Sequence, residues 1–128
     1  MKLLVHTHIL LWIAGVSRRL PASARDVIED TSNVIFFSTA SIWEVAIKAR
    51  LGYDDFAVDA RKLRSNLIEN NYQELPILGE HALGVANLPD IHKDPFDRIM
   101  IAQSFIEGLV MLTADRTVAK YGGLIRLV

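Results

Sequence analysis

The sequence contains no cysteine and only 4 prolines among its 128 residues, and its charges nearly balance. The absence of cysteine excludes a disulfide scaffold and a thiolate zinc site, and it fits a cytoplasmic protein. A formal net charge of −1 gives no global positive field, so a nucleic-acid partner would have to be bound by local lysines and arginines. No apolar run approaches the ~20 residues of a membrane span, so we expect no membrane partner.

The N-terminal residues resemble a secretory signal peptide only superficially. Lys2 precedes an apolar run, but the segment His6–His8 divides that run and two arginines follow it. We therefore expect a cytoplasmic protein. The length of 128 residues and the hydrophobic fraction of 51% suit a single globular domain that spans residues 1–128.

Apolar segments alternate with segments of helical periodicity along the chain. Short apolar runs predict strands at 3–5, 34–37, 109–113 and 125–127, and a weaker one within 72–78. Helices are predicted at 9–14, 21–29, 40–49, 58–69, 79–86, 95–107 and 116–120. Continuous apolar strands separated by helices indicate an α/β fold with a parallel sheet covered on both faces.

Polar side chains follow the predicted strands. His6, Thr7 and His8 come directly after the first strand, Ser38 follows the second, and Asp115 follows the fourth. Because parallel α/β folds bind ligands beyond the carboxyl ends of their strands, we expect these side chains at one edge of the sheet.

Several carboxylates would meet at this edge. Glu44 lies on the helix after the second strand, and Asp94 and Asp97 lie at the start of the long helix before Asp115. Carboxylates crowded in a cleft repel one another unless a cation compensates them, and Mg²⁺ and Mn²⁺ prefer such oxygen ligands. The residues therefore predict a metal-dependent phosphodiester hydrolase.

Each of these acids also has a simpler structural explanation. Asp94 can cap the long helix, and Asp97 can interact with the dipole of the same helix. Asp115 can be a turn or N-cap residue. Glu44 and Lys48 form an i, i+4 pair, for which a solvated salt bridge is the default interpretation.

The other aromatic and histidine positions are weak signals on their own. His6 and His8 could ligate one metal ion, but two histidines alone are weak evidence for a site. His81 and His92 are interpreted as loop residues without a role, and Trp43 as a core or interface residue.

Four segments together carry a resemblance to a known family. "LVHTHILLW", "STASIWEVAIK", "HKDPFDRIMIAQS" and "VMLTAD" resemble VapC-type toxins of the PIN-domain ribonucleases, in order and over the whole chain. The resemblance implies a three-layer α/β/α sandwich around a parallel sheet of four or five strands. It also implies the toxin of a type II toxin–antitoxin system, a Mg²⁺- or Mn²⁺-dependent endoribonuclease that cuts tRNA or rRNA. The implied partners are a VapB-type antitoxin, the RNA substrate and a second copy of the chain.

The resemblance also implies roles for individual residues. Catalytic and metal-binding acids would be Glu44, Asp97 and Asp115, with Asp94 as an accessory acid. Supporting hydroxyls at the site would be Thr7, Ser38 and Thr113. Cations close in sequence to these positions are the candidates for RNA phosphate contacts: Lys48, Lys93, Arg98 and Arg116.

One residue departs from the family pattern. Where the family has a metal-binding aspartate, this chain has His6, which removes one negative charge from the predicted site. A hard Mg²⁺ ion prefers oxygen, although Mn²⁺ can accept an imidazole. This mismatch favours an inactivating substitution, and a natural divergent variant is the alternative.

Two other functions compete with an active or weakened ribonuclease. The first is a non-catalytic PIN-like module that binds an antitoxin or RNA without cutting it. The second is a phospho-receiver domain, which also gathers acids at strand ends. Ser38 stands where such a receiver needs its acid, which argues against the second function.

Overall fold

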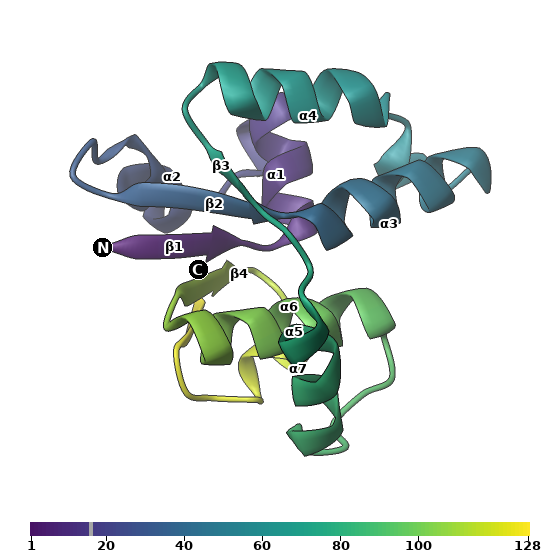
Figure 1. Cartoon of the computed structure of the whole chain (residues 1–128). Coiled ribbons are helices and arrows are strands. Elements are labelled where there is room, and N and C mark those ends of the chain that lie inside the picture. Colours follow the sequence, from purple (N-terminus) through teal and green to yellow (C-terminus); the bar gives the residue numbers. More distant parts are fainter. Residues whose placement is uncertain (16) are drawn as a thin grey trace.

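The computed structural model of the chain describes residues 1–15 and 17–128. Within these residues five strands form one sheet in the order β3-β2-β1-β4-β5 (Figure 1). The strands are β1 (Lys2–Val5), β2 (Val34–Ser38), β3 (Gln73–Leu75), β4 (Val110–Thr113) and β5 (Ile125–Leu127). Each neighbouring pair is parallel, which confirms the predicted α/β fold with its parallel sheet.

Helices connect these strands. The α-helices are α1 (Thr7–Ala14), α2 (Ala22–Glu29), α3 (Thr39–Arg50), α4 (Ala60–Glu69), α5 (Gly79–Gly84), α6 (Pro95–Glu107) and α7 (Arg116–Ala119). Short 3-10 turns are η1 (Ser17–Arg19), η2 (Asp54–Phe56) and η3 (Val85–Asn87). None of the helices in the described part of the chain is long and apolar enough to cross a membrane.

The core has two parts, one on each face of the sheet. Along β1, Leu3 and Val5 belong to one buried cluster and Leu4 to the other, as expected when successive side chains point to opposite faces. The first cluster includes side chains of α1, α3 and α4, and the second includes side chains of α6 and α7. Figure 1 shows α1 and α4 on one side of the sheet and α5, α6 and α7 on the other. This is the three-layer sandwich that the sequence predicts.

Local signals set the ends of the two helices that carry most of the predicted site. The Ser38 hydroxyl accepts a hydrogen bond from the backbone N–H of Ala40 at 3.0 Å and caps α3. At α6, Asp94 is the N-cap and Pro95 occupies the first turn, a favourable combination. Gly108 adopts a left-handed conformation with φ of 67° and ends α6.

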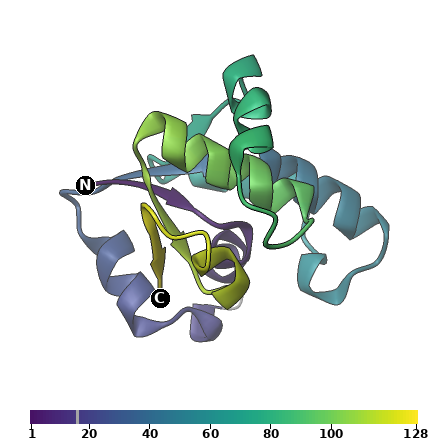
Figure 2. The ribbon, with the colours of Figure 1, turned by 90° about the horizontal axis from the view of Figure 1, so that it is seen from below.

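Helices α5 and α6 lie against each other on the same face of the sheet (Figures 1 and 2). They approach so closely at Gly84 that a Cβ atom there would lie 2.7 Å from Cδ1 of Ile106. This contact brings the short α5 next to the C-terminal turns of α6.

Two side chains of α3 differ from what its helical pattern indicates. An apolar stripe through Ile42, Val45, Ala46 and Ala49 is the pattern, but Ala46 is exposed and Glu44 is buried. Trp43 is more than half exposed, so it is not a core residue, and its ring packs edge-to-face on Phe96 with centroids 5.0 Å apart.

Candidate functional site

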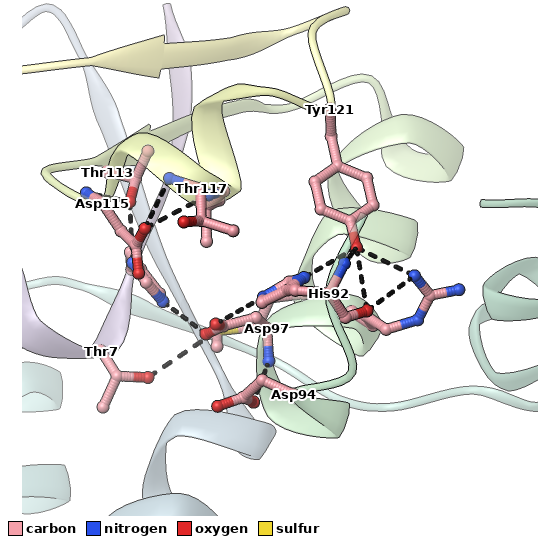
Figure 3. Close-up of polar contacts among 12 residues, drawn as sticks. Thr7, His92, Asp94, Asp97, Thr113, Asp115, Thr117 and Tyr121 are labelled. Atoms are coloured by element: carbon pink, nitrogen blue, oxygen red, sulfur yellow. Dashed lines mark hydrogen bonds and ion pairs between the residues drawn. The ribbon is translucent and has the colours of Figure 1, made fainter. Parts of the chain in front are cut away.

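Side chains of the predicted site gather at the carboxyl end of the sheet. His6 follows β1, Ser38 ends β2, and Thr113 ends β4. The N-terminus of α6 brings Asp97 to the same edge, and Figure 3 shows Asp97 between His92 and Thr113. The predicted convergence of strand ends and the start of the long helix is therefore present.

Asp97 accepts a hydrogen bond from an imidazole at each of its two carboxylate oxygens. Nε2 of His6 lies 2.7 Å from Oδ1, and Nε2 of His92 lies 3.0 Å from Oδ2. Asp97 and His6 are both buried. Because a carboxylate can only accept, the nitrogen that faces each oxygen must carry the proton. Both imidazoles are thus held with hydrogen on Nε2.

The other nitrogen of each imidazole faces a hydroxyl group. Nδ1 of His6 lies 2.8 Å from Oγ1 of Thr113, and Nδ1 of His92 lies 2.7 Å from the hydroxyl of Tyr121. The Thr113 oxygen also accepts the backbone N–H of Asp115 at 3.0 Å. A hydroxyl can donate a hydrogen bond or accept one, so both nitrogens of each ring have a partner.

Arg98 stabilises the loop that carries His92. Its Nη1 atom donates to the Tyr121 hydroxyl and to the Pro89 carbonyl, both at 2.9 Å, and its Nη2 atom donates to the Val85 carbonyl at 3.3 Å. These bonds connect the loop before α6 to the turn after α7. The orientation of His92 towards Asp97 therefore depends on Tyr121 and Arg98.

The pKa of Asp97 reflects these contacts. Burial acts to raise the pKa of this carboxyl, but the hydrogen bonds and charges of His6 and His92 outweigh burial and hold that pKa below its usual value. The position of Asp97 in the first turn of α6 also favours a carboxylate, because the N-terminus of a helix carries partial positive charge. Asp97 is therefore ionised at neutral pH.

A second buried charge lies beside this group on α3. Glu44 is 2% exposed, and its Oε2 atom accepts a hydrogen bond from Nζ of Lys48 at 2.6 Å. Burial acts to lower the pKa of this amine, but its hydrogen bond to Glu44 and the charges of Asp94 and Asp97 outweigh burial and raise that pKa. The default interpretation of a solvated salt bridge is wrong, because the pair is largely shielded from water.

The remaining oxygen of Glu44 stands out among buried polar atoms. Oε1 of Glu44 is buried and has no hydrogen-bond partner among the described residues. The Lys48 amine is held near this carboxylate from the other side, 4.9 Å from the Phe56 ring centroid and 5.7 Å from that of Phe96. An unpaired carboxylate oxygen at this position attracts a further hydrogen-bond donor or cation.

The chain Thr113–His6–Asp97 has the order of a hydroxyl–imidazole–carboxylate nucleophilic triad. A nucleophile must reach its substrate, and Thr113 is completely buried. Its oxygen is also occupied by the backbone N–H of Asp115. Thr113 is therefore a support for His6 and not a nucleophile.

The two flanking acids are helix caps. Oδ1 of Asp94 accepts the backbone N–H of Asp97 at 2.9 Å, and Oδ1 of Asp115 accepts the backbone N–H of Thr117 at 2.7 Å. Asp115 is exposed and Asp94 is partly exposed. The alternative that these acids cap helices is confirmed, and their free oxygens still border the site (Figure 3).

Two hydroxyls predicted to support the site are used in packing between elements. Oγ1 of Thr7 lies 2.9 Å from Oγ of Ser41, and the Ser38 hydroxyl donates to Oε1 of Gln103 at 2.6 Å. All four side chains are completely buried. Thr7 therefore joins α1 to α3, and Ser38 joins the end of β2 to α6.

The four predicted phosphate-binding cations differ in how available they are. Lys93 and Arg116 are exposed. Lys48 is paired with Glu44, and Arg98 is hydrogen-bonded within its own loop. Lys93 and Arg116 are thus the better placed candidates for an RNA phosphate.

The arrangement around Asp97 does not fit the divalent ion that the family resemblance implies. Mg²⁺ needs about six oxygen ligands at about 2.0–2.1 Å. Both Asp97 oxygens accept from imidazole N–H groups, and the proton on Nε2 of His6 prevents that nitrogen from binding a metal. The Glu44 Oε2 atom is taken by Lys48. His8 does not complete a ligand set either, because its ring centroid lies 6.3 Å from that of His6 and its Nε2 atom lies 4.0 Å from Oδ2 of Asp55.

In the described part of the chain, the three metal-ligating side chains whose ligand atoms lie within 4.8 Å of one another are not around Asp97 but at Glu80, His81 and Glu107. Nδ1 of His81 accepts the backbone N–H of Leu78 at 2.9 Å, so the proton of a neutral ring is on Nε2, which faces Glu107 at 3.1 Å. A protonated nitrogen cannot ligate a metal. This group therefore ties α5 to α6.

The interpretation of His81 and His92 as loop residues without a role is wrong. His81 is completely buried in α5, and His92 bonds Asp97. Tyr121, the partner of His92, was not predicted to take part at all. The one available signal was the position of His92 five residues before Asp97, and it does not reveal the direction of the ring.

The comparisons with known proteins agree with the fold described above. The sequence model of the PIN domain matches residues 3–124. No curated protein matches the chain. Twenty-eight solved chains are similar in structure.

Three of these solved structures illustrate the similarity. VapBC2 from Rickettsia felis, bound to a DNA fragment from its promoter, has a TM-score of 0.71 at 12% identity and covers 100% of this chain and 98% of its own. VapBC-1 from nontypeable Haemophilus influenzae has a TM-score of 0.66 at 14% identity, covering 94% and 92%. VapC20 from Mycobacterium tuberculosis, a Sarcin-Ricin loop cleaving toxin, has a TM-score of 0.65 at 13% identity, covering 94% and 95%.

Proposed function

Because the chain belongs to the PIN-domain family, we propose that it is the toxin component of a type II toxin–antitoxin pair of the VapC type. The observation that carries the proposal is the agreement of the whole fold, from β1 to β5, with toxins solved as VapBC complexes. The gathering of Asp97, Glu44, Asp94 and Asp115 at the carboxyl edge of the sheet supports the same function. We expect one domain over residues 1–128, located in the cytoplasm.

The reaction we propose for the family site is cleavage of structured RNA, either tRNA or rRNA. Lys93 and Arg116 would contact phosphates, since they are exposed beside the acidic residues. In this chain His6 stands at the position of the family aspartate and is hydrogen-bonded to Asp97. We therefore expect cleavage to be slowed by roughly 10²-fold or more, the upper range of losses when residues around a metal are changed.

The partner we propose is an antitoxin whose peptide carries an arginine or lysine. Asp94 and Asp115 border the site of Asp97, and Oε1 of Glu44 lacks a donor among the described residues. A guanidinium can satisfy such oxygens with directed hydrogen bonds. We also expect the toxin to pair with a second copy of itself.

Co-expression tests the partner. The chain and the antitoxin encoded beside its gene should co-purify as a complex, both with His6 and with the His6→Asp variant. The lost negative charge should weaken binding by the chain with His6 without abolishing it. If neither form yields a complex, the toxin–antitoxin proposal is wrong.

Single-turnover cleavage of a structured RNA in Mg²⁺ or Mn²⁺ tests the enzyme. Three proteins are compared: the chain itself, His6→Asp, and His6→Asp combined with Asp97→Asn. We expect cleavage by His6→Asp, cleavage slower by roughly 10²-fold or more by the chain itself, and no cleavage by the double variant. Cleavage by the chain at the same rate would mean that His6 does not impair the enzyme.

A non-catalytic module that binds an antitoxin or RNA is the second candidate function. The occupation of both Asp97 oxygens by imidazole N–H groups favours it for the chain as it stands. If all three proteins leave every RNA uncut but form the antitoxin complex, this function is preferred.

A further inference from the structure

We propose that His6 and His92 take the place of a metal ion at Asp97, so that this PIN domain folds and keeps its site intact without a divalent cation. The inference depends on the contacts of Asp97 and on the PIN fold. It does not depend on whether the chain is a toxin.

The first step concerns the charge of Asp97. This residue is only 7% exposed, and an ionised carboxylate in such a position is costly unless it is hydrogen-bonded or paired. Here each oxygen has a short bond to an imidazole nitrogen, at 2.7 Å and 3.0 Å. The two imidazoles therefore stabilise the buried Asp97 carboxylate, as a bound cation would do in a cluster of carboxylates without such donors.

The second step concerns the orientation of the two imidazoles. Thr113 faces the far nitrogen of His6, and Tyr121 faces the far nitrogen of His92. Each ring is therefore bonded at both ends, and neither can turn a free nitrogen towards an ion without losing a bond. A chain of hydrogen bonds thus runs from Thr113 through Asp97 to Tyr121.

The third step concerns what an aspartate at position 6 would do. It would face Asp97 across the gap that the His6 ring now spans, and two carboxylates in one buried site repel each other. Without a cation such a variant should be less stable than the chain with His6. A divalent ion that binds only the folded variant should restore its stability.

Thermal unfolding with and without metal tests the proposal. The chain with His6, His6→Asp and His6→Asn are each unfolded in EDTA, in millimolar MgCl₂ and in millimolar MnCl₂. Because His6 is the N-cap of α1, Asp at this position also caps the helix, and Asn provides the same cap without the charge. A parallel series adds Glu107→Gln to all three proteins. This substitution removes a carboxylate from the group of Glu80, His81 and Glu107, so that metal binding there cannot account for a change in melting temperature.

We expect the melting temperature of the chain with His6 to change by less than about 1 °C between EDTA and either metal. The melting temperature of His6→Asp should be the lowest of the three in EDTA and should rise by about 5 °C or more with Mn²⁺ or Mg²⁺. The melting temperature of His6→Asn should not respond to metal. The proposal would be overturned if metal raised the melting temperature of the chain with His6 as much as that of His6→Asp.

A second measurement keeps the proposal testable if His6→Asp does not fold. In the chain with His6, Asp97→Asn replaces one acceptor oxygen by an NH₂ group that faces an imidazole N–H, so the melting temperature in EDTA should fall. In the His6→Asp background the same change removes a repulsion, so it should raise the melting temperature. If Asp97→Asn raised the melting temperature of the chain with His6, the histidines would not be compensating Asp97.

These outcomes are independent of the proposed function. The unfolding experiments contain neither RNA nor antitoxin. If metal does not change the melting temperature of the chain with His6, the inference is supported even when no antitoxin complex forms. If the complex forms but metal stabilises the chain with His6, only this inference fails.

Discussion

The two ends of α6 carry the same chemical pair in different surroundings. At the N-terminal end, Asp97 accepts hydrogen bonds from Nε2 of two imidazoles. At the C-terminal end, Glu107 accepts a hydrogen bond from Nε2 of one imidazole, that of His81. The Asp97 side chain is 9% exposed, whereas that of Glu107 is 31% exposed. The helix dipole favours a carboxylate at the first end and disfavours it at the second.

The difference shows that burial and helix position, more than the identity of the partners, determine what a histidine–carboxylate pair contributes. Water can replace a lost partner at Glu107, but not at Asp97. The N-terminal pair therefore shapes the site, and the C-terminal pair only joins two helices. Substitutions at each end can break or sharpen this contrast.

The largest effect is expected from Asp97→Ala. It leaves the Nε2 donors of His6 and His92 without a partner in a buried site, so we expect the free energy of unfolding to fall by about 3 kcal/mol. The matched variant Glu107→Ala, on the same helix, should lose no more than about 1 kcal/mol because its site is open to water. Urea unfolding measures both, and equal losses would show that burial does not distinguish the two ends.

The next effect concerns a buried pair that contains no histidine. Lys48→Met leaves the Glu44 carboxylate at 2% exposure with neither oxygen paired, so we expect a loss of about 2–3 kcal/mol. The double variant Lys48→Met with Glu44→Gln removes the stranded charge and should recover at least about 1 kcal/mol. If Lys48→Met changes the urea midpoint no more than an exposed lysine variant such as Lys62→Met, burial of Glu44 has no energetic consequence.

A smaller effect is expected from Tyr121→Phe. The phenol hydroxyl lies 2.7 Å from Nδ1 of His92 and 2.9 Å from Arg98, and its removal should cost about 1 kcal/mol. Hydrogen exchange should also become faster in residues 88–94, which these bonds hold. The exposed Tyr53→Phe is the control, and unchanged exchange in Tyr121→Phe would mean that the loop does not depend on the hydroxyl.

The sheet and its long helix could be predicted because their signals are local. The apolar runs of β1, β2 and β4 and the start of α6 at Asp94–Pro95 are local features of the sequence. Parallel topology then places the strand ends together without further information. The predicted position of His6 at this edge follows from this rule, whereas the supporting role of Thr113 was implied only by the family resemblance.

The contacts within the site could not be predicted because they depend on side-chain direction and burial. Glu44 and Lys48 read as a surface pair since the i, i+4 rule ignores what packs over the helix. His92 lies in a loop without periodicity, and its partner Tyr121 is distant in the sequence. Ser38 follows its strand as predicted, but its hydroxyl bonds Gln103 in the core.

The smallest effect is expected from Glu107→Gln, and it sharpens the contrast between the ends of α6. The amide oxygen of glutamine can still accept the Nε2 hydrogen of His81, so the bond between α5 and α6 is kept in a weaker, uncharged form. At the same time the substitution removes a negative charge from the last turn of a helix, where the dipole disfavours it by a few tenths of a kcal/mol. The two contributions oppose each other, so the free energy of unfolding should change by less than about 0.5 kcal/mol. The isosteric change Asp97→Asn at the other end has neither advantage. Asparagine keeps an acceptor oxygen for only one of the two imidazoles, and the negative charge that it removes is one that the helix dipole favours. Urea unfolding of both amide variants at neutral pH measures the difference, and a loss in Glu107→Gln as large as that in Asp97→Asn would mean that neither burial nor the helix dipole separates the two pairs.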